Sequence, residues 1–153
     1  MILLYNITMR KKEQLTNELH TILESMGLDD YDHYIIQNDI SDDMTIHSFL
    51  QQYLKDHGMT KKELVKNSLL DRTYGYQILS GLRQPSRDKI LALCIAGKMA
   101  FHEVQRALEI AKAGILYPKD PRDAAIILCI HNQLYDMYDV NMYLDQKGFT
   151  PIR

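Results

Sequence analysis

Proline, glycine and cysteine are scarce in this sequence. Its 153 residues include only four prolines and seven glycines, which is too few for a collagen-like or low-complexity chain and unfavourable for a turn-rich β-sandwich. The only two cysteines, Cys94 and Cys129, lie within apolar stretches. We therefore expect reduced cysteines in a hydrophobic core, with a disulfide as the less favoured alternative.

Long hydrophobic runs are also missing. The apolar run Ala124–Ile130 is far shorter than the roughly 20 residues that a membrane-spanning helix needs. Residues 1–5 have neither the basic flank nor the small-residue cleavage site of a secretory signal. These absences predict a cytoplasmic protein with no membrane partner.

Charge is present in near balance but is unevenly distributed. The net charge is −2, which alone argues mildly against a nucleic-acid-binding protein. Residues 1–47 contain three basic and nine acidic side chains, residues 48–89 contain eight basic and four acidic ones, and residues 90–153 contain seven of each. The basic middle segment indicates a specific binding surface. The alternative is a solvent-facing helix that happens to be rich in lysine.

Helical periodicity and capping residues occur along nearly the whole chain. Thr60 and Glu63 have the spacing of a capping box, and Asp71 is placed to cap the helix that follows. Because apolar residues surround most of the helix that contains 124–130, we expect that helix to be buried from several sides. The predicted helices cover about 9–26, one short stretch within 29–43, 44–57, 60–68, 71–80, 87–96, 101–113, 121–131 and 136–147. No alternating strand pattern of useful length occurs, so the predicted fold class is all-α.

The two short helices at 60–68 and 71–80 are joined by only Leu69 and Leu70. Two short helices on a tight turn in a basic segment are typical of a helix-turn-helix that binds double-stranded DNA. Glutamine pairs with adenine and arginine with guanine, whereas tyrosine and threonine reach phosphates or a thymine methyl group. The candidate DNA-contacting residues are Lys61, Lys62, Arg72, Thr73, Tyr74, Tyr76, Gln77, Arg83 and Arg87. Of these, the two lysines, Arg83 and Arg87 are interpreted as phosphate contacts or, alternatively, as ordinary surface charges.

Residues 46–110 resemble the phage-repressor-like helix-turn-helix family, often called the XRE type. The segments that carry the resemblance are Met59–Lys66, Asp71–Ser80 and the G-x-x-x-P segment Gly81–Pro85. The Y-G-Y-Q-I string with P-S-R-D, and the later segments Leu116–Lys119 and Arg122–Ile126, resemble a variant group from Firmicutes and extend the similarity to about residue 150. The resemblance implies a lambda-repressor-like helical bundle that regulates bacterial transcription.

Three parts of the chain follow from these patterns. Residues 1–43 form an acidic N-terminal helical extension, which could also cover the basic surface, and residues 44–114 form the helix-turn-helix domain. Residues 115–153 form a pair of C-terminal helices, which are more apolar than packing on a small domain requires. This pair is interpreted either as a contact for a homodimer or a protein partner or as additional core.

The sequence departs from the family pattern at several positions. Leu69 stands where the turn usually has glycine, so the left-handed backbone is either strained or replaced by another turn. Val65 replaces the preferred alanine, and Leu79 stands where many members have an acidic residue. Gly75 lies in mid-helix, at a cost of about 1 kcal/mol relative to alanine; it either permits a close approach to a backbone or groove or lies against a tyrosine. The missing turn glycine, the acidic N-terminal third and the near-neutral isoelectric point favour an alternative function, a helical adaptor that no longer recognises DNA.

The sequence contains no recognisable catalytic motif. The six histidines are dispersed without metal-ligand spacing to a cysteine or carboxylate. The sequence contains no nucleophile elbow, phosphate-binding loop or dinucleotide fingerprint. We therefore expect no enzymatic activity, no metal and no cofactor.

Overall fold

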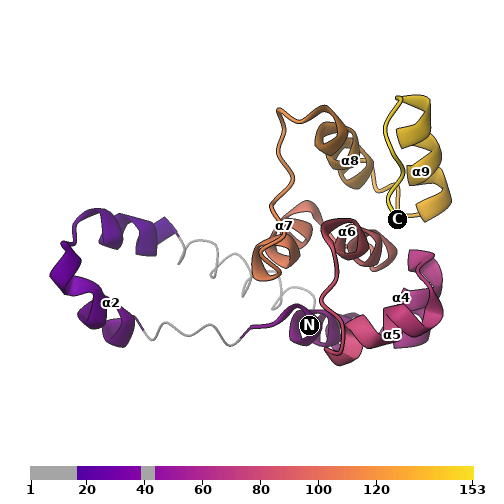
Figure 1. Cartoon of the computed structure of the whole chain (residues 1–153). Helices are drawn as coiled ribbons and strands as arrows, with labels where there is room; N and C mark the ends of the chain where they lie inside the picture. The colour runs from indigo at the N-terminus through magenta and orange to yellow at the C-terminus, as the bar shows by residue number, and fades with distance from the viewer. Residues whose placement is uncertain (1–16, 39–43) are drawn as a thin grey trace. The chain divides into compact units, whose positions relative to one another are not determined.

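The chain folds into helices connected by turns. The structure, a computed structural model, describes residues 17–38 and 44–153. Across these two ranges it contains no strand, so the prediction of an all-α fold is confirmed. The described residues fall into two compact units, one before Met44 and one from Met44 to Arg153 (Figure 1).

The first unit consists of a helix over residues 17–24, a 3-10 turn η1 (Leu28–Asp30) and helix α2 (Tyr31–Gln37). The turn is closed by Gly27, whose amide donates to Asp30 Oδ2 at 2.8 Å. Among the described residues of this unit, Tyr34 alone is buried. The predicted start of the first helix at residue 9 and the acidic residues at 39–43 lie outside the described residues.

The second unit follows the predicted order of helices. Its elements are α3 (Ile46–His57), α4 (Lys61–Ser68), α5 (Arg72–Ser80), α6 (Arg87–Ala96), α7 (Phe101–Ile110), α8 (Pro121–His131) and α9 (Met137–Gln146). Most helix ends agree with prediction to within two residues. Helix α7 stops three residues early because Lys112 adopts a left-handed backbone with φ of 53°, and Ala113 N donates back to Leu108 O at 3.0 Å.

Local caps explain why these helices begin where they do. The predicted capping box is present, since Glu63 N donates to Thr60 Oγ1 at 3.1 Å and Thr60 N donates to Glu63 Oε2 at 3.0 Å. Asp71 Oδ1 likewise accepts from Tyr74 N at 2.9 Å and caps α5. Each cap satisfies amide groups that the first turn of a helix leaves unpaired. Both carboxylates are therefore engaged with the main chain.

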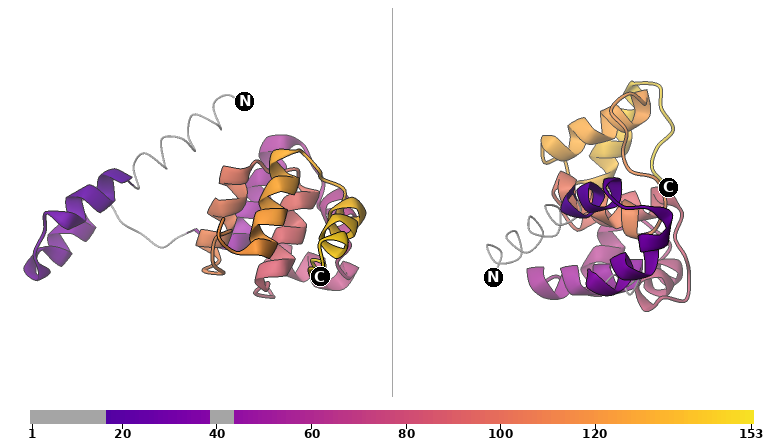
Figure 2. Two further views of the ribbon diagram at one scale, coloured as in Figure 1. Left: turned by 90° about the horizontal axis from the view of Figure 1, so that it is seen from above. Right: turned by 90° about the vertical axis from the view of Figure 1, so that its left-hand side faces the viewer.

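Helix α6 forms the centre of the second unit. Its residues Ile90–Ala96 are all buried, and it packs against α4, α7 and α9. The helix containing 124–130 was expected to be buried from several sides, and Ala125, Ile126, Cys129 and Ile130 are buried, but one side faces the solvent. That helix, α8, packs mainly on α7 and α9 at the edge of the unit (Figure 2), and Leu128 is consequently 52% exposed.

The two cysteines belong to this core. Cys94 and Cys129 are both buried and have free thiols, as the sequence predicted. Burial raises the pKa of each thiol, because the thiolate loses its hydration. Residues 115–153 lie in the same compact unit as residues 44–114. None of the helices described is long and apolar enough to cross a membrane.

Candidate nucleic-acid interface

The turn between α4 and α5 keeps a left-handed residue at Leu69. Its backbone has φ of 60° and ψ of 13°, a conformation that costs a residue with a Cβ roughly 1–2 kcal/mol. Ser68 supports the turn, because its hydroxyl donates to Val65 O at 2.7 Å and accepts from Leu70 N at 3.3 Å. Of the two alternatives for this position, the strained left-handed backbone is the one observed.

Helices α4 and α5 approach closely where Val65 faces Gly75. A Cβ added to Gly75 would lie 2.7 Å from Val65 Cγ1 and 3.1 Å from Val65 Cγ2. Gly75 is therefore packed against a valine, and both explanations given above for this glycine, a close backbone or groove and a neighbouring tyrosine, are replaced. The larger residue at 65 and the missing side chain at 75 compensate for each other.

One side of α5 is anchored in the core. Ile78 and Leu79 are fully buried, so an apolar residue suits position 79. Gln51 of α3 donates from Nε2 to Leu79 O at 2.6 Å and fixes the end of the helix. The opposite side of α5, which carries Arg72 and Thr73, is left facing the solvent.

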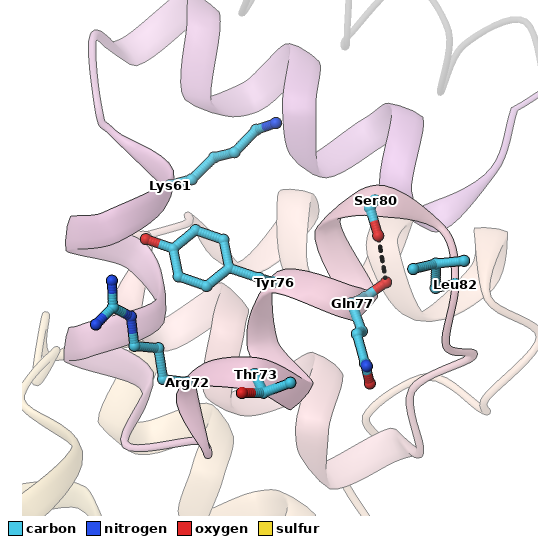
Figure 3. A pocket seen from close by; sticks show the side chains of 7 residues that line it. All are labelled: Lys61, Arg72, Thr73, Tyr76, Gln77, Ser80 and Leu82. Carbon is cyan, nitrogen blue, oxygen red and sulfur yellow. Dashed lines mark hydrogen bonds between the residues drawn. The ribbon is translucent and has the colours of Figure 1, made fainter.

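An open hollow of about 630 Å³ lies on this exposed side of α5 (Figure 3). It is lined by Lys61, Arg72, Thr73, Tyr76, Gln77, Ser80 and Leu82. Its volume is in the range of small-molecule sites, but such sites are enclosed and mostly apolar, whereas this surface is open and carries cationic and hydrogen-bonding side chains. The hollow brings together five of the nine predicted DNA-contacting residues, all but one of them from α5.

Among residues 17–38 and 44–153, the cationic side chains around the hollow have no acidic partner. Within the described ranges, no ion pair engages Lys61, Lys62, Arg72 or Arg83. The guanidinium carbon of Arg72 instead lies 5.9 Å from the ring centroid of Tyr76, a cation–π contact between residues four positions apart. Because Lys61, Lys62, Arg72 and Arg83 outnumber the capping carboxylates Glu63 and Asp71, positive charge dominates this surface.

Arg83 is linked to the hollow through Gln77. Its Nε donates to Gln77 Oε1 at 3.2 Å, and since arginine has only donors, the atom that it meets must be the amide oxygen. The main-chain oxygen of Gln77 accepts from Leu82 N at 2.9 Å and from Ser80 Oγ at 3.1 Å. Arg83 thus uses one of the two acceptor sites of Oε1, the atom that would also accept from adenine in a bidentate contact.

Arg87 is placed differently from the other candidates. Its Nη1 and Nη2 donate to the two Asp123 carboxylate oxygens at 2.8 and 2.7 Å, and Nε and Nη2 donate to the main-chain oxygens of Gly114 and Ile115. All three guanidinium nitrogens are thus used within the fold. The interpretation of Arg87 as a phosphate contact is replaced by one in which it ties α6 to α8.

A second ion pair joins α6 and α8, here with the arginine on α8 and the aspartate on α6. Arg122 of α8 donates to both carboxylate oxygens of Asp88 on α6, at 3.1 and 2.9 Å. Burial alone would raise the pKa of Asp123, but hydrogen bonds from Arg87 and from the Tyr117 amide outweigh it and lower that pKa. The two Arg-Asp dipeptides of the sequence therefore pair with each other across the α6–α8 contact.

The remaining candidates lie outside the hollow. Tyr74 faces α6, where Lys89 Nζ is 5.4 Å from its ring centroid, and Lys62 is exposed but does not line the hollow. Conversely, Leu82 and Ser80 line it although neither was among the predicted DNA-contacting residues. Leu82 had a sequence signal, because it is an apolar residue in the otherwise polar turn of residues 81–86.

Because comparisons with known proteins found no match, the function must be inferred from this geometry. No protein-family model, no curated protein and no solved structure matches the chain.

Proposed function

We propose that the protein is a cytoplasmic regulator of transcription that binds double-stranded DNA. In this proposal α4 and α5 act as a helix-turn-helix, and α5 enters the major groove. The observation that carries the proposal is the clustering of Lys61, Arg72, Thr73, Tyr76 and Gln77 around one open hollow of α5. Side chains of these types supply phosphate contacts and base contacts together.

The charges around α5 give the expected strength of the electrostatic contribution. Lys61, Lys62, Arg72 and Arg83 are available as phosphate contacts, whereas Arg87 is engaged with Asp123. Four neutralised phosphates correspond to a slope of about −3.6 for the logarithm of affinity against the logarithm of salt concentration. Binding by one protomer should then weaken about 150-fold between 50 and 200 mM salt.

The experiment is a salt titration of DNA binding by the wild type and by two charge variants. Arg83→Ala is expected to lower the magnitude of the slope by about 0.9, because one fewer counterion is released. Arg106→Ala on α7 is the matched control, since it removes the same charge from a surface pair with Glu109 and should leave the slope unchanged. A wild-type affinity that does not fall with salt would contradict the proposed function.

A single unit of this kind recognises about one half-site, so specific binding calls for two copies. We assign the homodimer contact to α8 and α9, whose exposed surface includes the large apolar residues Leu128, Tyr138 and Met142. Light scattering should give a dimeric mass for the wild type and a monomeric mass for Leu128→Glu. A monomeric wild type bound to a full site would refute this assignment.

The alternative function is that of a helical protein-interaction adaptor. The observation that favours it is the surface of the first unit, where Leu28, Tyr31 and Ile36 are exposed and residues 17–38 contain five acidic and no Lys or Arg side chains. An adaptor should bind a protein partner through this unit and show no sequence preference on DNA. Selection of DNA sites by the purified protein separates the two functions.

A further inference from the structure

Leu82 is an apolar side chain presented to solvent from a fixed main chain. It is 78% exposed and lines the hollow beside Gln77 and Ser80. Its amide is bound to Gln77 O at 2.9 Å. The preceding Gly81 has φ of 84°, and a Cβ there would lie 2.8 Å from the ring of His47 on α3, so the turn is seated tightly on its neighbour.

Leucine on such a surface contributes nothing to phosphate binding. In the major groove, the apolar group available to it is the C5-methyl group of thymine. The side chain therefore favours contact with a base edge over contact with the sugar–phosphate backbone.

The amide of Gln77 offers its two donors to the same hollow, while Arg83 uses one of the two acceptor sites of the amide oxygen. Its Oε1 accepts from Arg83 Nε at 3.2 Å, while no hydrogen bond among the described residues uses its Nε2. The two N–H groups of Nε2 suit an acceptor on a base, such as O4 of thymine or O6 and N7 of guanine. Cytosine presents a donor at the corresponding position and is disfavoured.

We propose that Gln77 and Leu82 together select thymine at one position of the DNA site, an inference that rests on the DNA-binding function proposed above. Thymine is the base whose major-groove edge combines an acceptor, O4, with a methyl group. Gln77 Nε2 donates to O4, and Leu82 contacts the methyl group. Arg83 holds the amide of Gln77 in the orientation that directs donors to the base.

The test begins with selection of DNA sites by the full-length protein at physiological salt. Each thymine of the selected site is then replaced in turn by deoxyuridine, which removes only the methyl group. At one thymine the wild type should lose about fourfold in affinity, the value for one buried methyl group. Replacement of the same thymine by 5-methylcytosine keeps the methyl group but turns the acceptor into a donor, and should cost about a further fivefold.

Variants of Leu82 and Gln77 show which side chain causes the loss of affinity for deoxyuridine and which causes the loss for 5-methylcytosine. Leu82→Ala should bind the thymine and deoxyuridine sites equally, and Gln77→Ala should lose the additional penalty for 5-methylcytosine. Leu23→Ala is the matched control, because it removes an exposed leucine from the first unit and should keep both penalties.

The outcomes separate the inference from the function on which it rests. If no site is selected and affinity does not depend on salt, the DNA-binding function fails and the thymine contact fails with it. If a site is selected but every deoxyuridine is tolerated by the wild type, the inference alone is overturned. The same conclusion follows if Leu82→Ala retains the full penalty for deoxyuridine.

Discussion

The contact between Val65 and Gly75 makes a quantitative prediction about the packing of α4 on α5. Alanine at position 75 would place its Cβ 2.7 Å from Val65 Cγ1. Val65 is only 3% exposed, and a β-branched side chain in a helix has one strongly preferred rotamer, so it cannot turn away cheaply. The predicted consequence is that substitutions at these two positions are strongly coupled.

The expected free energies follow from the two kinds of change. Gly75→Ala gains about 1 kcal/mol of helix propensity but overpacks the contact by about 1–3 kcal/mol, so it should be neutral to destabilising by about 2 kcal/mol. Val65→Ala removes two methyl groups and leaves a cavity, which should cost about 2 kcal/mol. In the double variant the new methyl group at 75 fills part of this cavity without a clash, and stability should return to within about 1 kcal/mol of the wild type.

Urea unfolding followed by far-ultraviolet circular dichroism measures the cycle. The wild type, both single variants and the double variant should have similar m-values, so that midpoints report stability directly. A favourable coupling energy of about 2 kcal/mol is expected, within the range for residues in contact. If the two single effects add to within about 0.5 kcal/mol, the compensation between Val65 and Gly75 is refuted.

Two further predictions concern the ion pair of Asp123 and the bond between Arg83 and Gln77. Because the folded state lowers the pKa of Asp123, the stability that this carboxylate contributes is present above its unfolded pKa of about 3.9 and is lost as pH falls through the lower folded value. Asp123→Asn should therefore be less stable at neutral pH and lose less stability on acidification, as measured by urea unfolding at several pH values; parallel curves would contradict this. Arg83→Ala should free Gln77 Oε1 and shift the base selected opposite Gln77 toward adenine, and an unchanged selected sequence would show that Arg83 does not orient the amide.

The helix boundaries were predictable from sequence because the signals that set them are local. Thr60 with Glu63 and Asp71 each act within three residues, and all are found as caps. The end of α7 was missed because it depends on the left-handed backbone of Lys112, a conformation that lysine rarely adopts and that no neighbouring residue announces. The exposed side of α8 at Leu128 was not foreseen, because an apolar composition does not say whether a helix lies at the centre or at the edge.

The candidate site was predictable only where helical spacing determines which side chains share one surface. Arg72 with Tyr76, and Thr73 with Gln77, share a surface because four positions separate them on α5, and both pairs line the hollow. The place of Arg87 could not be predicted in this way, since its partner Asp123 is 36 residues away. Leu82 was overlooked because the role proposed for it depends on contact with a base, which the sequence alone does not suggest.

The positions that carry the family resemblance separate into two groups with different physical roles. The two Arg-Asp dipeptides, which begin at Arg87 and Arg122, form ion pairs with each other and fix α6 against α8. Their presence therefore supports the architecture and gives no information about DNA. The proposed recognition of DNA depends instead on the exposed side of α5 and on Leu82, which line the open hollow. Substitutions within the first group should act through stability, whereas those within the second should act through affinity and base preference.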